Sequence, residues 1–263
     1  MTKKNPPGRA RPIVSAPAAI GTAACGTHGA SSCLTCSGRD SAEWGVLDKA
    51  ELRRLDAARS THVYKPGQVV YYQGNPALGV FCVESGEIVL RRADAQGHSA
   101  VMGMATPGRA LGYRAFFAGG AHGETAEALT ETRICFLDRG ILRELLDKDS
   151  RLGHRFFKRV EEDLSASEQA RMAMGLLDVR QRLAHLLLAL KERRGSVEPD
   201  GTLLIDLPLS RQDIASLLGV RPETITRTIR AMEDAGVASF VGRSVRVPDL
   251  NLLLDELESA ETV

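Results

Sequence analysis

The sequence predicts an α+β chain that combines a double-sheet β-roll, a long helix and a C-terminal winged helix–turn–helix. Short β-rich runs separated by glycines fill the first half, a long helical periodicity follows, and two helices joined by a glycine turn precede a β-hairpin. The expected parts are an arm with a cysteine segment (1–43), the β-roll of jelly-roll type (44–148), the long helix (149–176) and the winged helix–turn–helix (177–263).

Composition excludes several classes of protein. Hydrophobic residues make up 43% and charged residues 25% of the 263 residues, as in ordinary soluble domains, and the net charge of +1 gives no global reason to bind nucleic acid. No apolar run reaches the roughly 18 residues of a membrane span. Residues 1–24 are rich in Pro, Ala and Gly and lack the leucine core of a signal peptide, so we expect a flexible arm and a cytoplasmic protein.

The β-roll is predicted from short runs of strand-favouring residues that are separated by glycines. Helical periodicity over residues 44–60 comes first. Runs such as "GVFCVESGEIVL" and "ETRICFL" then read as short strands, and their even spacing is typical of a barrel or a double-sheet roll. The predicted turn residues are Gly67, Gly74, Gly86, Gly97 and Gly108.

The long helix carries a seam of the kind found in two-stranded coiled coils. Seam positions recur in steps of three and four, which predicts pairing with a second copy of the chain. The polar residues in the second half of the seam predict that this pairing is weak. An amphipathic helix packed on its own domain is the alternative. The seam residues are Phe157, Val160, Leu164, Ser167, Arg171 and Met174.

The most specific stretch is "LSRQDIASLLGVRPETITRTIRAMEDAGV". Ser210 can cap the first helix, Gly219 can make the turn, and Pro222 suits the first position of the second helix. The apolar residues of the second helix then face inward. In a helix–turn–helix the start of the second helix enters the major groove of DNA.

The outward side chains of that second helix have the chemistry for reading bases. Arg227 can bind guanine bidentately, Glu223 can accept from cytosine, and Thr226 can meet a thymine methyl group. The alternative is a helical hairpin with ordinary surface charges. The residues expected to contact phosphates are Arg221, Arg230 and Arg243, with Arg246 of the wing as a further candidate.

The order of β-roll, seam helix and winged helix resembles the CRP/FNR family of bacterial transcription regulators. "RPETITRTIRAME" is similar to the family's E-T-x-S-R recognition helix, with Thr226 where that pattern usually has Ser. The resemblance implies a roll like that of cyclic-nucleotide-binding domains and a homodimer on an inverted repeat of TTGAT-like half-sites in double-stranded DNA. It also implies RNA polymerase as a partner and no enzymatic activity.

The segment "CGTHGASSCLTCS" resembles the N-terminal cysteine segment of the FNR branch, and "ALTETRICFLDRGILREL" resembles the stretch that carries that branch's distant cysteine. The resemblance implies an oxygen-labile 4Fe–4S cluster held by Cys25, Cys33, Cys36 and Cys135. The spacing of seven and then two residues is the inverse of the family's order. His28 therefore stays open as an alternative to Cys25.

Other readings of the cysteines remain open. Cys33 and Cys36 can form a metal-free disulfide switch, or a zinc site together with His28. Nitric oxide is an alternative signal to oxygen. Cys82 lies inside a predicted strand and is expected to fill the interior of the roll as a small hydrophobe.

Two further functions are disfavoured. Where the cyclic-nucleotide branch of the family carries a phosphate-binding Gly-Glu turn and an Arg-Ser pair, this chain has Arg109 after its glycine and Gly123-Glu124-Thr125. Because Glu124 would repel a phosphate, cyclic nucleotide binding is not expected. The chain has no phosphate loop and no nucleophile elbow, so we expect no enzyme.

Overall fold

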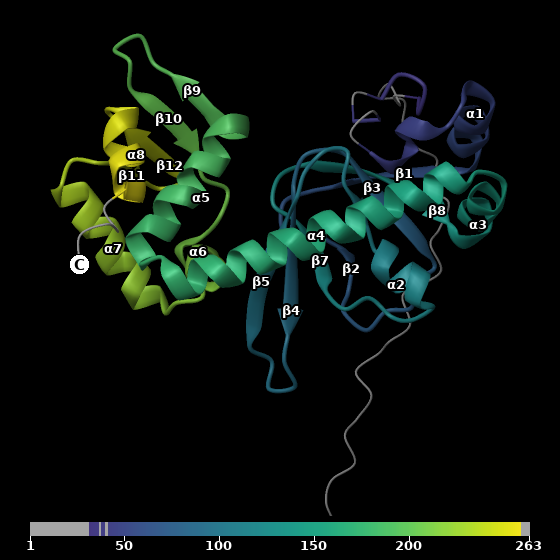
Figure 1. Cartoon of the computed structure of the whole chain (residues 1–263), viewed down its shortest axis with the longest axis horizontal. Helices are drawn as coiled ribbons and strands as arrows, with labels where there is room; N and C mark the ends of the chain where they lie inside the picture. The colour runs from purple at the N-terminus through teal and green to yellow at the C-terminus, as the bar shows by residue number, and fades with distance from the viewer. Residues whose placement is uncertain (1–31, 37, 40–41, 259–263) are drawn as a thin grey trace, which may run out of the picture. The chain divides into compact units, whose positions relative to one another are not determined.

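The computed structural model describes residues 32–36, 38–39 and 42–258 of the chain (Figure 1). Two of the predicted site residues, Cys25 and His28, lie outside the described residues, as does the predicted arm. Among the described helices, none is both long enough and apolar enough to cross a membrane.

Two antiparallel sheets of four strands form the β-roll, which confirms the predicted double-sheet architecture (Figure 1). Strand pairing is antiparallel throughout both sheets. The first sheet has the order β1 (Ser60–Tyr64), β8 (Thr132–Asp138), β3 (Gly79–Ser85), β6 (Ala110–Leu111). The second has the order β2 (Val69–Tyr71), β7 (Thr125–Ala128), β4 (Ile88–Ala93), β5 (Ser99–Ala105).

The turns between these strands are made by glycines, as predicted. Gly86 shows why: its φ is 81°, and a Cβ there would lie 2.3 Å from the carbonyl oxygen of Glu131. Both the left-handed backbone and the close approach require a residue without a side chain. The predicted turn residues with positive φ are Gly67, Gly74, Gly86, Gly97 and Gly108.

Short helices cover the first sheet. The prediction of one helix over residues 44–60 is wrong: a 3₁₀ turn, η1 (Glu43–Val46), is followed by a separate helix, α1 (Lys49–Ala58). Asp48 interrupts the run because its carboxylate accepts from the backbone N–H groups of Ala50 and Glu51, starting α1 with a capping box. The remaining helices here are α2 (Tyr113–Ala118) and α3 (Arg139–Lys148).

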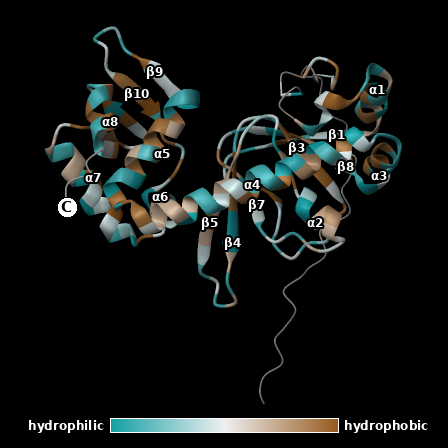
Figure 2. Ribbon diagram, viewed as in Figure 1, coloured by the Kyte–Doolittle hydropathy of each residue, from teal (hydrophilic) through white to brown (hydrophobic). Residues whose placement is uncertain are grey.

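Helix α4 (Ser150–Leu176) is continuous over 27 residues, which confirms the predicted long helix. Its first turns pack on the roll through Leu152 and Phe156, which are fully buried. The predicted seam begins at the next residue and points away from the chain's own core, since Phe157 is 73% and Leu164 is 56% exposed. Hydrophilic and hydrophobic residues alternate along this helix (Figure 2).

The C-terminal part is a winged helix–turn–helix, as predicted. Its sheet has the order β11-β12-β10-β9, and its core includes Leu187, Ile205, Ile214 and Ile229. Helix α8 was not predicted. The elements are α5 (Val179–Arg194), β9 (Gly195–Val197), β10 (Leu203–Asp206), α6 (Arg211–Leu217), α7 (Pro222–Asp234), β11 (Ser239–Val241), β12 (Ser244–Val247) and α8 (Leu250–Glu258).

Candidate functional site

Four cysteines line one small cavity between the first sheet and the segment that precedes η1. Cys33 and Cys36 come from that segment, Cys82 from β3 and Cys135 from β8. The sequence groups Cys33, Cys36 and Cys135, and the structure places all three on this cavity. It adds Cys82, which was expected in the interior of the roll.

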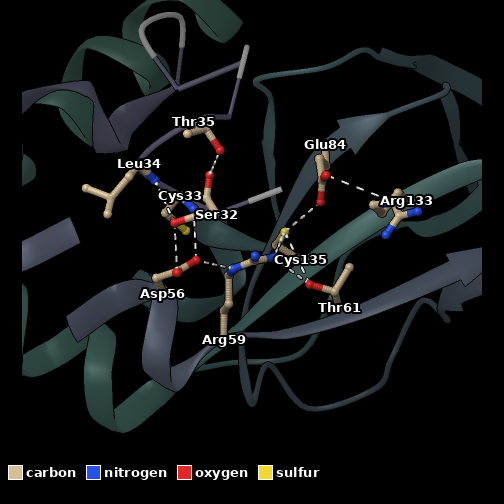
Figure 3. A network of polar contacts seen from close by, with 10 residues as sticks. All are labelled: Ser32, Cys33, Leu34, Thr35, Asp56, Arg59, Thr61, Glu84, Arg133 and Cys135. Carbon is tan, nitrogen blue, oxygen red and sulfur yellow. Dashed lines mark hydrogen bonds and ion pairs between the residues drawn. The ribbon is translucent and has the colours of Figure 1, made fainter. Parts of the chain in front are cut away.

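An aspartate and an arginine at the end of α1 join the two halves of this cavity (Figure 3). The carboxylate of Asp56 accepts from the backbone N–H of Cys33 at 2.8 Å and from Nε of Arg59 at 2.8 Å. The same guanidinium donates through Nη1 to Sγ of Cys135 at 3.2 Å. Asp56 and Arg59 therefore connect the N-terminal cysteines to the distant one, although no motif in the sequence marks them.

Burial favours the neutral form of the Cys33 and Cys135 thiols. Burial raises the pKa of the Cys33 thiol to about 12 and also raises the pKa of Cys135, while the positive charge of Arg59 works against both shifts. Sγ of Cys135 donates to the carboxylate of Glu84 at 3.4 Å. A ligand that needs thiolates must displace these protons, and the guanidinium of Arg59 lies where it can stabilise the resulting negative charge.

The cavity also touches the segment that reaches helix α4. Ala42 and Trp44 line the cavity. On its other side this segment binds α4: Arg155 donates to the carbonyl of Ala42 at 3.0 Å, and the Trp44 ring packs edge-on against Phe156 with centroids 5.6 Å apart. The segment of Ala42 and η1 thus contacts the thiol cavity and the long helix at once.

The thiol donors of the cavity suit an iron–sulfur cluster, but its volume is too small for one. The donor set fits, because four thiols converge with the cation Arg59 in a mostly apolar surrounding. The free volume is about 30 Å³, which suffices for one or two waters, so a cluster requires the Cys33–Cys36 segment to move outward. In the described residues, no three His, Cys, Asp or Glu side chains are arranged to hold a single metal ion.

A second cavity of about 290 Å³ lies beside Arg109 and Glu124, where the cyclic-nucleotide branch of the family binds a phosphate. Arg114 forms an ion pair with Glu124 at 2.7 Å, and Arg109 forms one with Asp163 of α4. Both guanidinium groups are thus already paired with carboxylates. The absence of cyclic nucleotide binding remains a prediction.

The helix–turn–helix has the local chemistry that the sequence predicts. Oγ of Ser210 accepts from the backbone N–H of Asp213 at 3.1 Å, and the Asp213 side chain accepts from the N–H of Ser210. Gly219 has a φ of 68°, and Pro222 begins α7 after Arg221, which makes no side-chain cap. The buried face of α7 consists of Ile225, Ile229 and Met232.

The opposite face of α7 carries the predicted base-reading side chains. Glu223 and Arg227 are exposed, whereas Thr226 is half-buried and its hydroxyl donates to the carbonyl of Pro222 at 3.0 Å. Because that hydroxyl is engaged, the methyl group of Thr226 is the part left for a base. The predicted phosphate contacts Arg221, Arg230 and Arg243 are exposed, and Arg246 forms an ion pair with Glu198 at 2.7 Å.

Known proteins share both halves of this arrangement. The Crp-like helix-turn-helix domain matches residues 181–256, and the cyclic nucleotide-binding domain matches residues 61–149. The transcriptional activator protein FnrL of Cereibacter sphaeroides is 28% identical over 228 residues, which cover 85% of this chain and 91% of that protein. The nitrogen fixation regulation protein FixK of Bradyrhizobium diazoefficiens is 26% identical over 218 residues, covering 82% and 90%.

A solved structure shows the same fold. FixK2 from Bradyrhizobium japonicum superposes with a TM-score of 0.64 at 23% identity, covering 75% of this chain and 96% of that one. The two matched domains occur in the order that the roll and the winged helix take here, with α4 between them. The chain is a DNA-binding transcription regulator of the CRP/FNR family, related to the FNR-like proteins and not an enzyme.

Proposed function

We propose that this regulator responds to oxygen or to redox conditions through a 4Fe–4S cluster bound at the thiol cavity. The observation that carries the proposal is the meeting of Cys33, Cys36 and Cys135 on one cavity, although they come from distant parts of the chain. Cys25, the fourth donor that the sequence predicts, and its alternative His28 lie outside the described residues. When bound, such a cluster supplies oxygen-sensitive redox chemistry.

The chain's own residues hold the site together in this proposal. Asp56 orients Arg59 and binds the backbone of Cys33, so the Cys33 segment is tied to the protein before any ligand arrives. Arg59 stabilises the thiolate of Cys135 once its proton has left. The Cys33–Cys36 segment must move outward when the cluster binds. This movement displaces Ala42 and η1, which follow the segment in the chain.

The contacts of η1 with α4 provide the route from the sensor to the dimer. Glu43 is 2% exposed and forms an ion pair with Arg159 at 2.7 Å, next to the packing of Trp44 on Phe156. These contacts lie just before and within the first turns of the predicted seam. A shift of η1 therefore changes the position of the seam, and a weak dimer is sensitive to small changes in free energy.

The predicted dimer pairs the exposed seam of α4 with a second copy of the chain. Phe157, Val160 and Leu164 are large, apolar and 41–73% exposed, so pairing removes them from water. A homodimer presents two α7 helices to an inverted repeat of TTGAT-like half-sites in double-stranded DNA. Contact with RNA polymerase in the cytoplasm completes the proposed role.

Replacing Leu164 by Glu is expected to abolish the dimer while leaving the protomer folded. The side chain is 56% exposed in the protomer, so the change does not disturb its core, but it places two carboxylates against each other across the seam. We expect the dimer dissociation constant to rise about 100-fold or more. Sedimentation equilibrium measures this. Gln169→Glu adds the same charge at an exposed position off the seam and should leave the dimer intact.

Anaerobic purification followed by iron, sulfide and absorbance analysis tests the proposed cluster. The expected result is a brown protein with about four iron and four sulfide per chain that bleaches in air. Cys135→Ser should abolish the colour, because this thiol is the distant donor. An anaerobic product that is colourless and free of iron, yet binds operator DNA, contradicts the cluster and favours the metal-free thiol switch. One zinc per chain favours the zinc site.

A further inference from the structure

Cys82 and Cys135 are direct partners in the first sheet. In the antiparallel pairing of β3 with β8, Cys82 lies opposite Cys135. Directly opposed residues point to the same face of a sheet, with Cβ atoms about 4.5–5.5 Å apart. The strand pairing alone therefore places a second thiol beside the distant cysteine.

The pleat of β3 turns Cys82 towards the N-terminal cysteines. Its neighbours Phe81 and Val83 pack in the core between the two sheets, whereas Cys82 packs with Trp44 and Leu55 on the opposite face. The expectation that Cys82 fills the interior of the roll is therefore wrong, although it is buried, with 7% of its surface exposed. This face is the one that carries the thiol cavity.

The sulfur of Cys82 is buried beside Trp44 at the wall of the cavity. Its Sγ makes a long hydrogen bond to the carbonyl of Val83 at 3.9 Å and a further one with the side chain of Trp44. The sulfur lines the cavity together with those of Cys33, Cys36 and Cys135. All four of these thiols belong to the described residues, so the set of four is complete without Cys25 or His28.

We infer that Cys82, rather than Cys25, is the fourth thiolate of the cluster site, so that Cys33, Cys36, Cys82 and Cys135 form the ligand set. This inference rests on the proposed function. To hold a cluster, each of these thiols would give up its proton to solvent, with no change in the oxidation state of the sulfur. Two ligands then come from one rigid pair of strands and two from the segment that must move.

The test removes Cys25 with His28 in one variant and Cys82 in others. The chain has five cysteines, so a Cys25→Ser, His28→Ala double variant keeps only the four that line the cavity. Purified anaerobically, this variant should contain about four iron and four sulfide per chain, like the unaltered protein. Cys82→Ser and Cys82→Ala should contain less than about one iron. Thermal unfolding of the iron-free proteins checks that the variants fold.

The outcomes separate the two proposals. An unaltered protein without iron contradicts the cluster itself. A loaded unaltered protein with loaded Cys82 variants overturns the assignment of Cys82 and leaves the cluster standing. Loss of the cluster in the Cys25, His28 double variant also overturns the assignment. If neither Cys82 variant folds, the iron content of the Cys25, His28 double variant alone tests the assignment. This variant can bind a complete cluster through cysteines only by using all four cavity thiols.

Discussion

Replacing Arg227 by Ala is expected to reduce affinity for the operator more than any other single change on the surface of α7. Arg227 is exposed on the second turn of the helix, opposite the buried Ile225 and Ile229. A bidentate contact between arginine and guanine contributes about 1–3 kcal/mol of discrimination. A dimer loses two such contacts, so the dissociation constant should rise by about 30-fold to about 10⁴-fold.

Fluorescence anisotropy on a TTGAT-like inverted repeat and on a scrambled duplex of equal length measures this effect. Arg227→Ala should bring the two affinities close together, because the lost contact is the one that reads sequence. Arg230→Ala is the matched control. It also removes one exposed positive charge from α7, but a phosphate contact is lost equally on both duplexes. Equal loss on both duplexes for Arg227→Ala would refute its assignment as a base reader.

Replacing Asp56 by Asn is expected to destabilise the sensor domain by about 2–3 kcal/mol, less than the roughly 3–5 kcal/mol for breaking a fully buried ion pair, because the Asp56 side chain is 28% exposed. The Arg59 side chain is 8% exposed and loses its ion pair with Asp56, while the Cys33 backbone loses a charged acceptor. The midpoint of thermal unfolding should fall by about 4–12 °C, since each kcal/mol corresponds to about 2–4 °C in a chain of this size. Differential scanning calorimetry measures the shift.

Acid pH gives an independent measurement of the same carboxylate. Burial alone would raise the pKa of Asp56, but hydrogen bonds from Cys33, Arg59 and Ser32 outweigh it and lower the pKa from 3.8 to about 2. A carboxylate whose pKa is lower in the folded state than in the unfolded state stabilises the fold at pH values above its unfolded-state pKa. This contribution is lost as the pH falls through its folded-state pKa. Asp56 therefore stabilises the chain fully above about pH 4, and its contribution disappears towards pH 2.

The Asn variant should lack this part of the acid dependence. The difference in stability between the two proteins should be constant at neutral pH and shrink between about pH 4 and pH 2. Asp147→Asn is a control on α3, where the carboxylate is not part of the thiol network. A stability difference that is independent of pH would mean that the charge of Asp56 does not act through Arg59.

Local signals explain why so much of the fold could be predicted. Gly219 and Pro222 specify a turn and a helix start by their own backbone preferences, and the 3.6-residue period of α7 marks its buried face. Helix α2 escaped prediction because it has six residues, too few to show a period. Two left-handed glycines bound it, Gly112 and Gly119, and both resemble the turn glycines of the surrounding strands.

The thiol site could be predicted only in part, because some of its residues are brought together by strand pairing and not by a local motif. Cys33, Cys36 and Cys135 stand in recognisable segments, so a resemblance could group them. The roles of Cys82, Asp56 and Arg59 depend on which strand lies beside which and in what register, and strand register is a property of the folded sheet. No spacing within the chain encodes it.

The position of Trp44 makes it an optical reporter. It is the chain's single tryptophan, and its ring lies between the thiol cavity and Phe156 of α4. The intrinsic fluorescence of the unlabelled protein therefore comes from one indole at the junction of sensor and long helix. Its emission can follow both ligand occupancy and the movement of η1 in real time, without any introduced dye.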